Sequence, residues 1–288
     1  MSALESTDAT FAPVPLPSRM RRAGWRRLRP HSWIEVFLPV IVFALALGLW
    51  EALVRLRGIP PYILPAPSLV AATLARDWPV LSASLLVTLG TTVEALALAV
   101  AGSLVLALLF TQSRWVERTF FPFAVVLQVT PVVAIAPLLL IYLDGRTAVL
   151  VCAFLVAFFP ILSNTVLGLA STDHNLLELM ELYRAPRWRQ ILLLRLPAAL
   201  PFFLGGLRIG GGLALIGAIV AEIAAGSAGQ GSGLAFRIVE SGFRLNIPRM
   251  FAALTLISLT GILIYLFFGL LSHALLHRWH DSARRRSA

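Results

Sequence analysis

The chain has 288 residues, of which 58% are hydrophobic and 13% are charged, and its formal net charge is +10. Soluble domains contain about 25% charged residues, so this composition excludes an ordinary soluble domain and indicates an integral membrane protein. All 24 basic residues are arginine. A Walker A loop needs a lysine to reach the nucleotide phosphates, so the chain contains no such loop.

Residues 1–32 precede the first long apolar block and combine a Pro-rich part with six arginines. Arginines beside an apolar segment are typical of a cytoplasmic anchor on anionic membrane lipid. The apolar stretch that follows is too long for the h-region of a cleaved signal peptide, which spans about 7–15 residues. We therefore expect residues 1–32 to form a retained cytoplasmic tail.

Six apolar segments follow, each long enough to cross a hydrocarbon core of about 30 Å as a helix of about 20 residues. They lie near 33–54, 84–110, 120–143, 147–169, 198–224 and 249–276. The sequence thus predicts an all-α integral membrane protein with six transmembrane helices. The six helices are expected to form one domain over 33–276, followed by a basic cytoplasmic tail at 277–288.

The positions of the arginines predict the orientation of the chain. With the N-terminus inside, the inner segments hold 16 arginines and the outer segments hold 7. The positive-inside rule therefore favours a multi-pass protein with both termini in the cytoplasm. A nucleic-acid binder would carry its arginines as a stripe on a soluble fold, so no nucleic-acid partner is expected.

Six polar residues and one glycine inside the expected spans are candidates for a translocation path. They are Glu94, Gln128, Thr130, Asn164, Arg208, Gly210 and Glu222. A central arginine costs roughly 2.5–3.5 kcal/mol on insertion scales, so Glu94 and Arg208 should each face protein or water. They are expected at similar depth, where pairing with each other, snorkelling and substrate contact are open interpretations. Glu222 is expected at the outer interface, and the glycines of the fifth span fit either close helix packing or an approach to substrate.

A polar and basic stretch at 170–197 separates the fourth and fifth apolar segments. Asn175, followed three residues later by Glu178, has the form of a capping box. The next apolar residues have the spacing i, i+3, i+4, i+7, which is typical of a helix with one apolar face. They are Leu176, Leu179, Met180 and Tyr183.

Pro186 breaks this helical pattern, so a second short helix is expected to begin there. Both helices are expected on the cytoplasmic side of the membrane. An amphipathic hairpin lying on the bilayer would also explain the arginines and leucines of this stretch. It does not explain Glu178 and Glu181, which anionic lipid would repel.

The same stretch resembles the cytoplasmic signature of bacterial ABC importer permeases, which reads E-A-A, three residues, G, nine residues, I, one residue, L-P. Glu178, Leu196 and Pro197 match this signature in register. Other residues replace the two alanines, the glycine and the isoleucine. These substitutions lie at Leu179, Met180, Arg184 and Leu194.

Two further blocks make the resemblance specific. LPAALPFFLGGLRIGGGLALIGAIVAE, at 196–222, is similar to the downstream helix of the nitrate/sulfonate/taurine-type permease family, and LPAPSLVAATL, at 64–74, is similar to its outer helix. The similarity covers about 33–276. ELYRAPRW is similar to a subgroup that imports pyrimidine thiamine precursors or riboflavin.

The resemblance implies the permease subunit of an ATP-driven importer in the bacterial inner membrane, with the type I importer permease fold and a cytoplasmic coupling hairpin. Such a subunit forms the translocation path and binds no cofactor itself, because two copies of a partner ATPase use the ATP and Mg²⁺. The other implied partners are a second permease copy and a periplasmic or lipoprotein substrate-binding protein. The second copy completes a homodimer or a related heterodimer, and the binding protein docks on 57–83 and 225–248.

The resemblance also implies which residues couple the permease to the ATPase, within a segment at about 171–197. They are Glu178, Leu179, Met180, Glu181, Tyr183, Arg184, Pro186, Leu196 and Pro197. The apolar face of a short helix can insert into a groove of a partner. Arginine does not favour the positive φ that a glycine allows, so Pro186 is expected to set the bend in place of the signature glycine.

Two other function classes fit the sequence less well. An ATPase-independent secondary transporter or channel would show inverted repeats or more intramembrane acids. An intramembrane serine hydrolase needs a histidine base in the membrane core, but the five histidines lie in the tails, in the cytoplasmic loop or at the end of the sixth span. No metal site is expected, since His273 and His277 have no carboxylate between them.

Overall fold

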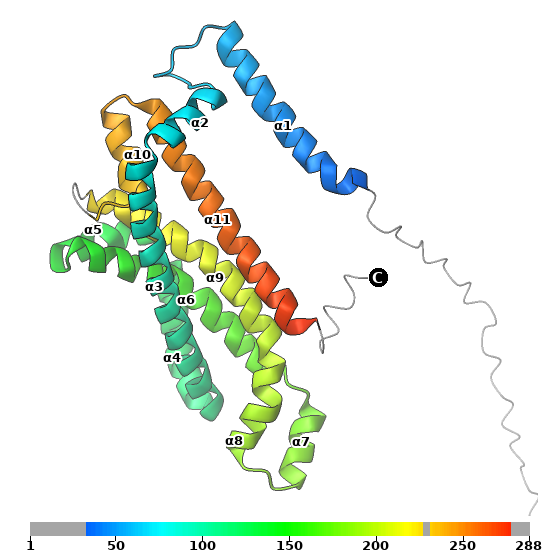
Figure 1. The fold of residues 1–288 in the computed structure, drawn as a ribbon. Coiled ribbons are helices and arrows are strands. Elements are labelled where there is room, and N and C mark those ends of the chain that lie inside the picture. Colours follow the sequence, from blue (N-terminus) through cyan, green and yellow to red (C-terminus); the bar gives the residue numbers. More distant parts are fainter. Residues whose placement is uncertain (1–32, 227–230, 278–288) are drawn as a thin grey trace, which may run out of the picture.

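The computed structural model describes residues 33–226 and 231–277, and within them every regular element is a helix (Figure 1). The tail expected at 1–32 lies outside these residues, as does the tail expected at 277–288 except for its first residue. The helices are α1 Trp33–Leu56, α2 Pro67–Arg76, α3 Trp78–Gln112, α4 Arg114–Val129, α5 Val132–Tyr142, α6 Gly145–Ala170, α7 His174–Leu182, α8 Arg187–Gln190, a π-helical turn Ile191–Arg195, α9 Leu196–Ala225, α10 Leu234–Phe243 and α11 Ile247–Leu276.

Five helices in the described part of the chain are long and apolar enough to cross a membrane. They are Phe37–Leu56, Trp78–Gln112, Gly145–Ala170, Arg187–Ala225 and Ile247–Leu276. An all-helical membrane protein is thereby confirmed. The count of six continuous spans is not confirmed, because the apolar segment expected at 120–143 forms two shorter helices.

The break in that segment lies at Thr130 and Pro131. α4 ends at Val129 and α5 begins at Val132, with Pro131 as the N-cap residue of α5. A proline has no N–H for the helix ladder and disfavours helical geometry in the residue before it, so one continuous helix is interrupted at this point. Thr130 is accordingly extended, with φ −68° and ψ 123°.

The centre of the bundle is the contact between α6 and α9, which is the most extensive between any two helices (Figure 1). A Cβ atom at Gly206, Gly210 or Gly217 would come within 3 Å of an atom of α6. Small residues permit this close approach of two helix backbones, which is favoured in membranes. The packing interpretation therefore holds for these three glycines, whereas Gly212 has no neighbouring atom within 4 Å of such a Cβ.

α1 stands apart from the other long helices (Figure 1), and only 6% of its most apolar window is buried. Its contacts lie near its C-terminal end, where the rings of Trp50 and Phe251 of α11 are 5.8 Å apart. There Glu51 also accepts hydrogen bonds from the backbone N–H of Ser68 at 2.9 Å and from its hydroxyl at 2.7 Å. These contacts fix the start of α2 against α1.

Asp77 connects the start of α3 to the start of α11. Its carboxylate accepts a 2.6 Å hydrogen bond from Nε of Arg249 and a 3.2 Å bond from Nε of Arg76. The Arg249 guanidinium holds the pKa of the Asp77 carboxyl below its ordinary value, with a smaller contribution from Arg76. Asp77 is therefore ionised at neutral pH and secures the end of the bundle that α2 and α10 occupy.

The contact between α6 and α9 yields a direct test. We expect Gly217→Ala to be about 1–3 kcal/mol less stable than Gly212→Ala, because only the first places a methyl group 2.9 Å from the Ala153 Cα. Both substitutions bring the same gain in helix propensity, of about 1 kcal/mol, so Gly212→Ala is the matched control. Thermal unfolding of the purified chain in detergent measures the difference, and equal midpoints for the two variants would contradict this packing.

Candidate functional site

Two regions carry most of the residues singled out by the sequence, and they lie at opposite ends of α9. The first is the segment from α7 to the start of α9. α7 begins after Asp173, whose carboxylate accepts a 2.9 Å hydrogen bond from the backbone N–H of Asn175. The expected capping box of Asn175 with Glu178 is therefore wrong. The Glu178 carboxylate instead lies 3.1 Å from Nε2 of His174, one turn earlier.

α7 presents an apolar face to the surroundings, and none of its residues is buried. Leu176, Leu179 and Tyr183 are 46%, 50% and 78% exposed, as their spacing predicts. Met180, expected on the same face, is half-buried. Leu177 lies on the bundle side, where it lines a cavity of about 280 Å³ at the ends of α3 and α6. α7 thus borders the bundle at Leu177 and is open on its other side.

Arg184 forms the turn that follows α7. Its φ is +51°, and two hydrogen bonds close the turn: Ala185 N–H to the Met180 carbonyl at 2.9 Å, and Arg184 N–H to the Glu181 carbonyl at 2.8 Å. These are the two bonds of the Schellman motif, in which the left-handed residue is usually glycine. The expectation that Pro186 replaces this turn is wrong, since Arg184 adopts the geometry of the signature glycine. Pro186 caps α8 instead.

α8, the π-helical turn and α9 follow one another without a break. Pro197 explains the π-helical turn, because a proline offers no N–H to the carbonyl four residues earlier. The ladder is instead continued by a bond from Leu196 N–H to the Ile191 carbonyl, five residues back. Leu196 and Pro197 therefore lie within a continuous helix that leads from Arg187 into the bundle.

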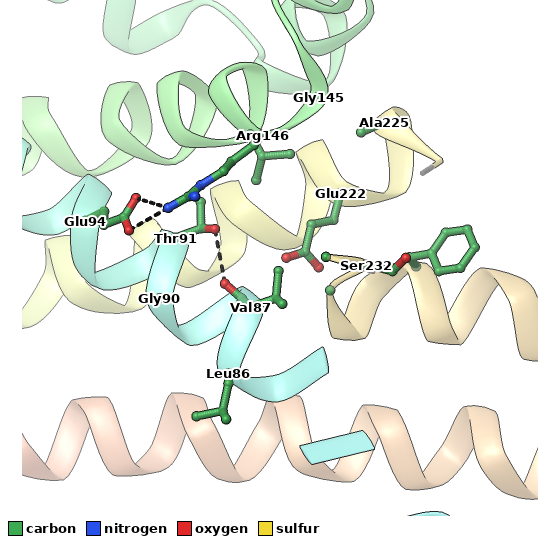
Figure 2. Close-up of a pocket in the computed structure, with 14 residues that line it drawn as sticks. Leu86, Val87, Gly90, Thr91, Glu94, Gly145, Arg146, Glu222, Ala225 and Ser232 are labelled. Carbon is green, nitrogen blue, oxygen red and sulfur yellow. Dashed lines mark hydrogen bonds and ion pairs between the residues drawn. The ribbon is translucent and has the colours of Figure 1, made fainter. Parts of the chain in front are cut away.

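The second region is a cavity of about 660 Å³ between α3, the start of α6 and the end of α9 (Figure 2). Glu94 projects from α3 and Arg146 from α6, and the Arg146 Nη2 lies 2.8 Å and 3.1 Å from the two carboxylate oxygens. Arg208 does not pair with Glu94. Its guanidinium instead lies 3.7 Å from the ring centroid of Tyr265 on α11.

Glu222 lies in the wall of the same cavity, three residues before the end of α9, and is 7% exposed (Figure 2). Its expected depth at the outer membrane interface stays a prediction. Its carboxylate accepts hydrogen bonds from the Thr88 hydroxyl at 2.8 Å and from the backbone N–H of Ala235 at 3.1 Å. The same hydroxyl oxygen accepts a 2.9 Å bond from the N–H of Leu234. Glu222 and Thr88 thereby satisfy two N–H groups that the first turn of α10 leaves without helical partners.

Gly233 allows this arrangement, because a Cβ atom there would overlap the Glu222 carboxylate. Thr88, Arg146 and Gly233 were not singled out by the sequence. The glycine-rich run before α10 was the available signal for Gly233. No local pattern indicates that Thr88 and Arg146 meet carboxylates on distant helices.

The other candidates for a path lie outside this cavity. Gln128 borders a small space of about 20 Å³ between α4 and α6. The Thr130 hydroxyl and the Asn164 amide donate to backbone carbonyls one turn earlier, at 2.8 Å each. Gly210 packs against Ile161 of α6. Of the seven candidates, the structure brings together Glu94 and Glu222 in one site. Within residues 33–226 and 231–277, no three His, Cys, Asp or Glu side chains cluster closely enough to hold a metal ion.

The left-handed conformation of Arg184 predicts that replacing this residue by glycine stabilises the turn. An L residue in left-handed geometry costs about 1–2 kcal/mol, which Arg184→Gly relieves. We expect slower hydrogen exchange at the amide of Ala185, by about fivefold, in Arg184→Gly but not in the matched variant Arg184→Ala. Exchange measured by mass spectrometry on the chain in detergent tests this, and equal rates in both variants would show that the turn is unstrained.

The contact of Gly233 with Glu222 predicts a loss of stability. Gly233→Ala forces the carboxylate away from Thr88 and Ala235, and we expect a loss of about 1–3 kcal/mol. Gly242→Ala in α10 is the control, since a Cβ there meets only a sulfur atom of Met250, at 3.8 Å. Thermal unfolding in detergent compares the two variants, and an unchanged midpoint in Gly233→Ala would rule out the close approach.

Comparison with known proteins agrees with these features. Residues 99–283 match the family described as binding-protein-dependent transport system inner membrane component. The chain is 36% identical to the riboflavin transport system permease protein RibX of Chloroflexus aurantiacus, over 89% of this chain and 95% of that protein. It is 35% identical to the formylaminopyrimidine transport permease protein ThiX of Halalkalibacterium halodurans, over 78% and 89%. It is 29% identical to the putative aliphatic sulfonates transport permease protein SsuC of Bacillus subtilis, over 88% and 90%.

Proposed function

The chain belongs to the binding-protein-dependent transport system inner membrane component family. From that premise we propose that it couples conformational changes of a separate ATPase to opening and closing of an import path. The membership makes it a multi-pass permease subunit of an ABC importer, whose partners are an ATPase and a substrate-binding protein. Our proposal concerns how this permease meets those partners, and which residues take part.

The observation that carries the proposal is the open face of α7. Leu179 and Tyr183 are exposed, whereas Leu177 faces a cavity at the ends of α3 and α6, and an exposed apolar helix face is suited to a groove in another protein. Glu178 and Glu181 border this face, and Arg184 follows it in the turn. The charges give a groove both an acidic and a basic partner to recognise. We propose that this face, with the turn through Pro186, docks into the ATPase.

The helix that follows provides a route for the movement. Arg187 to Ala225 is a continuous helix, and its first turns carry Leu196 and Pro197. Its far end carries Glu222, in the wall of the larger cavity. A displacement of the docked segment therefore reaches that cavity through one stiff element, packed along its length on α6. Closure of the ATPases on ATP would in this way alter the cavity at the opposite end.

The proposed assembly follows from the presence of one coupling segment in each chain. Two ATPase copies need two such segments, so we propose a homodimer of this chain, with a heterodimer of related permeases as the alternative. ATP and Mg²⁺ are bound by the ATPases and not by this chain. We propose that both termini and α7 are cytoplasmic in the bacterial inner membrane, and that the binding protein docks at the end formed by α2 and α10.

The names of the relatives indicate the class of cargo. The riboflavin and formylaminopyrimidine permeases are 36% and 35% identical to this chain, and the sulfonate permease is 29% identical. We therefore propose a polar heterocycle such as a flavin or a pyrimidine as the cargo. No observation favours the ATPase-independent transporter or channel, since these relatives are transport permeases of the same family.

Reversal of one charge beside the docking face tests the coupling. We expect Glu178→Arg to leave the chain folded in the membrane and to reduce ATP-driven uptake at least tenfold, because it presents a cation where the partner groove meets an anion. The control Asn175→Arg adds an arginine to the same helix without removing the acid. Uptake and ATP hydrolysis are measured in vesicles containing permease, ATPase and binding protein. Undiminished uptake in Glu178→Arg would refute the proposed docking.

A further inference from the structure

We propose that the cavity between α3, α6 and α9 is a charge filter of the import path, and that it takes uncharged polar heterocycles and rejects anions. This inference rests on the proposed function, because it assigns a selective step to the same path. Its size is suitable, since sites for small molecules occupy about 300–1,000 Å³ and this cavity has about 660 Å³.

The walls combine apolar surface with a few polar side chains, as a site for an uncharged polar ring requires. Leu86 and Val87 of α3, Val149 of α6 and Phe236 of α10 contribute apolar surface. Glycines at positions 90, 145, 231 and 233 leave the backbone close to the space. The ionisable residues of the lining are Glu94, Arg146 and Glu222 (Figure 2). A few polar groups in an apolar wall are the usual arrangement for fixing the orientation of a small ligand.

The charges in the lining leave no uncompensated cation for an anionic cargo. Arg146 is already paired with Glu94. A second cavity of about 570 Å³ adjoins the first, sharing Val87, Gly231 and Ser232 with it, and its arginine is Arg237. That guanidinium lies 2.8 Å from Glu240 and donates to Ser84 at 2.9 Å. An anion that accepts from the remaining N–H groups of either arginine would lie beside the paired glutamate, whose negative charge offsets the attraction of the guanidinium.

An uncharged heterocycle avoids this conflict. The Glu94 and Arg146 side chains are 48% and 73% exposed, so both can be reached from the cavity. Their contact uses one nitrogen of the guanidinium, which carries five N–H groups in all, and a carboxylate has about four acceptor positions. A ring with adjacent N–H and C=O groups can donate to Glu94 and accept from Arg146 while the pair stays intact. The Glu94–Arg146 ion pair is thus the element that recognises the hydrogen-bonding groups of the cargo.

The buried Glu222 adds to the exclusion of anions. Its oxygens accept from Thr88 and from the start of α10, so the carboxylate is fixed in the wall and cannot turn away from an incoming group. Release of Glu222 would leave the backbone N–H of Ala235 and the hydroxyl proton of Thr88 without their acceptor, which is costly for buried groups. The filter therefore has one adjustable element, the exposed pair, and one fixed element, Glu222.

Binding of small probes to the purified full-length chain in detergent tests the filter. The uncharged probes are riboflavin and a formylaminopyrimidine, and the anionic probes are nitrate and methanesulfonate, each followed by the shift of the thermal unfolding midpoint. We expect the wild-type chain to be stabilised by an uncharged probe and not by the anions. In Glu94→Gln, Arg146 is left unpaired, and the ratio of anion to uncharged affinity should rise at least tenfold, the loss expected for a hydrogen bond to a charged group.

Two further variants separate recognition from damage to the fold. Arg146→Gln also breaks the pair but leaves no cation, so it should weaken the uncharged probe without any gain of anion binding. Glu51→Gln removes a glutamate that pairs with Arg55 within α1 and accepts a hydrogen bond from Ser68 of α2, outside the cavity, and should leave the ratio unchanged. If Glu94→Gln does not fold, the double variant Glu94→Gln with Arg146→Gln takes its place, and it should lose the uncharged probe and gain no anion.

The probe-binding measurements test the charge filter separately from the proposed coupling of α7 to the ATPase. Stabilisation of the wild-type chain by nitrate or methanesulfonate as strong as that by the uncharged probes would overturn it, as would the absence of any shift with all four probes. An unaltered ratio in Glu94→Gln would also overturn it. Because this measurement uses neither ATPase nor binding protein, it can fail while Glu178→Arg still abolishes ATP-driven uptake, and it can succeed when the proposed coupling fails.

Discussion

The close contact of α6 with α9 is the constraint on which the rest of the structure depends. Gly206, Gly210 and Gly217 of α9 have no side chains of their own, so α9 approaches α6 closely at these three positions. Close-packed interiors transmit displacements instead of absorbing them, so the two ends of α9 are mechanically related. One end continues into the segment that carries α7, and the other carries Glu222. The same contact therefore positions both regions that the chain needs for its proposed work.

Charge compensation organises the cavity end of the bundle. Glu222 joins α9 to α3 and α10, and Glu94 joins α3 to α6 through Arg146. A buried polar group is tolerated only when its hydrogen bonds are satisfied, and the first turn of α10 supplies what Glu222 requires. The helices around the cavity are in this way cross-linked by polar contacts, in a bundle whose other contacts are largely apolar. The exposed pair is the part of this network that is open to a ligand.

Local patterns in the sequence predicted the features that depend on neighbouring residues, namely the helices and the apolar face of α7. The apolar segments became helices, and the spacing of Leu179 and Tyr183 predicted the open face of α7. The helix break at Pro131 has a local cause in the proline itself, but whether a proline bends or divides a membrane helix depends on its neighbours. The partners of Glu94 and Glu222 are 52 and 134 residues distant along the chain. Helix periodicity contains no information on such pairs, so the cavity could not be assembled from the sequence.

The π-helical turn at Ile191–Arg195 has a geometric consequence for α7. A π turn holds one residue more than an α turn, and each residue of an α-helix turns the chain by about 100°. Everything before Ile191 is therefore rotated by about that angle relative to an uninterrupted helix. The extra residue in the π turn therefore sets the direction in which α8 and the turn before it point relative to α9. Pro197, a signature position, thus specifies the direction in which a helix more than ten residues upstream points.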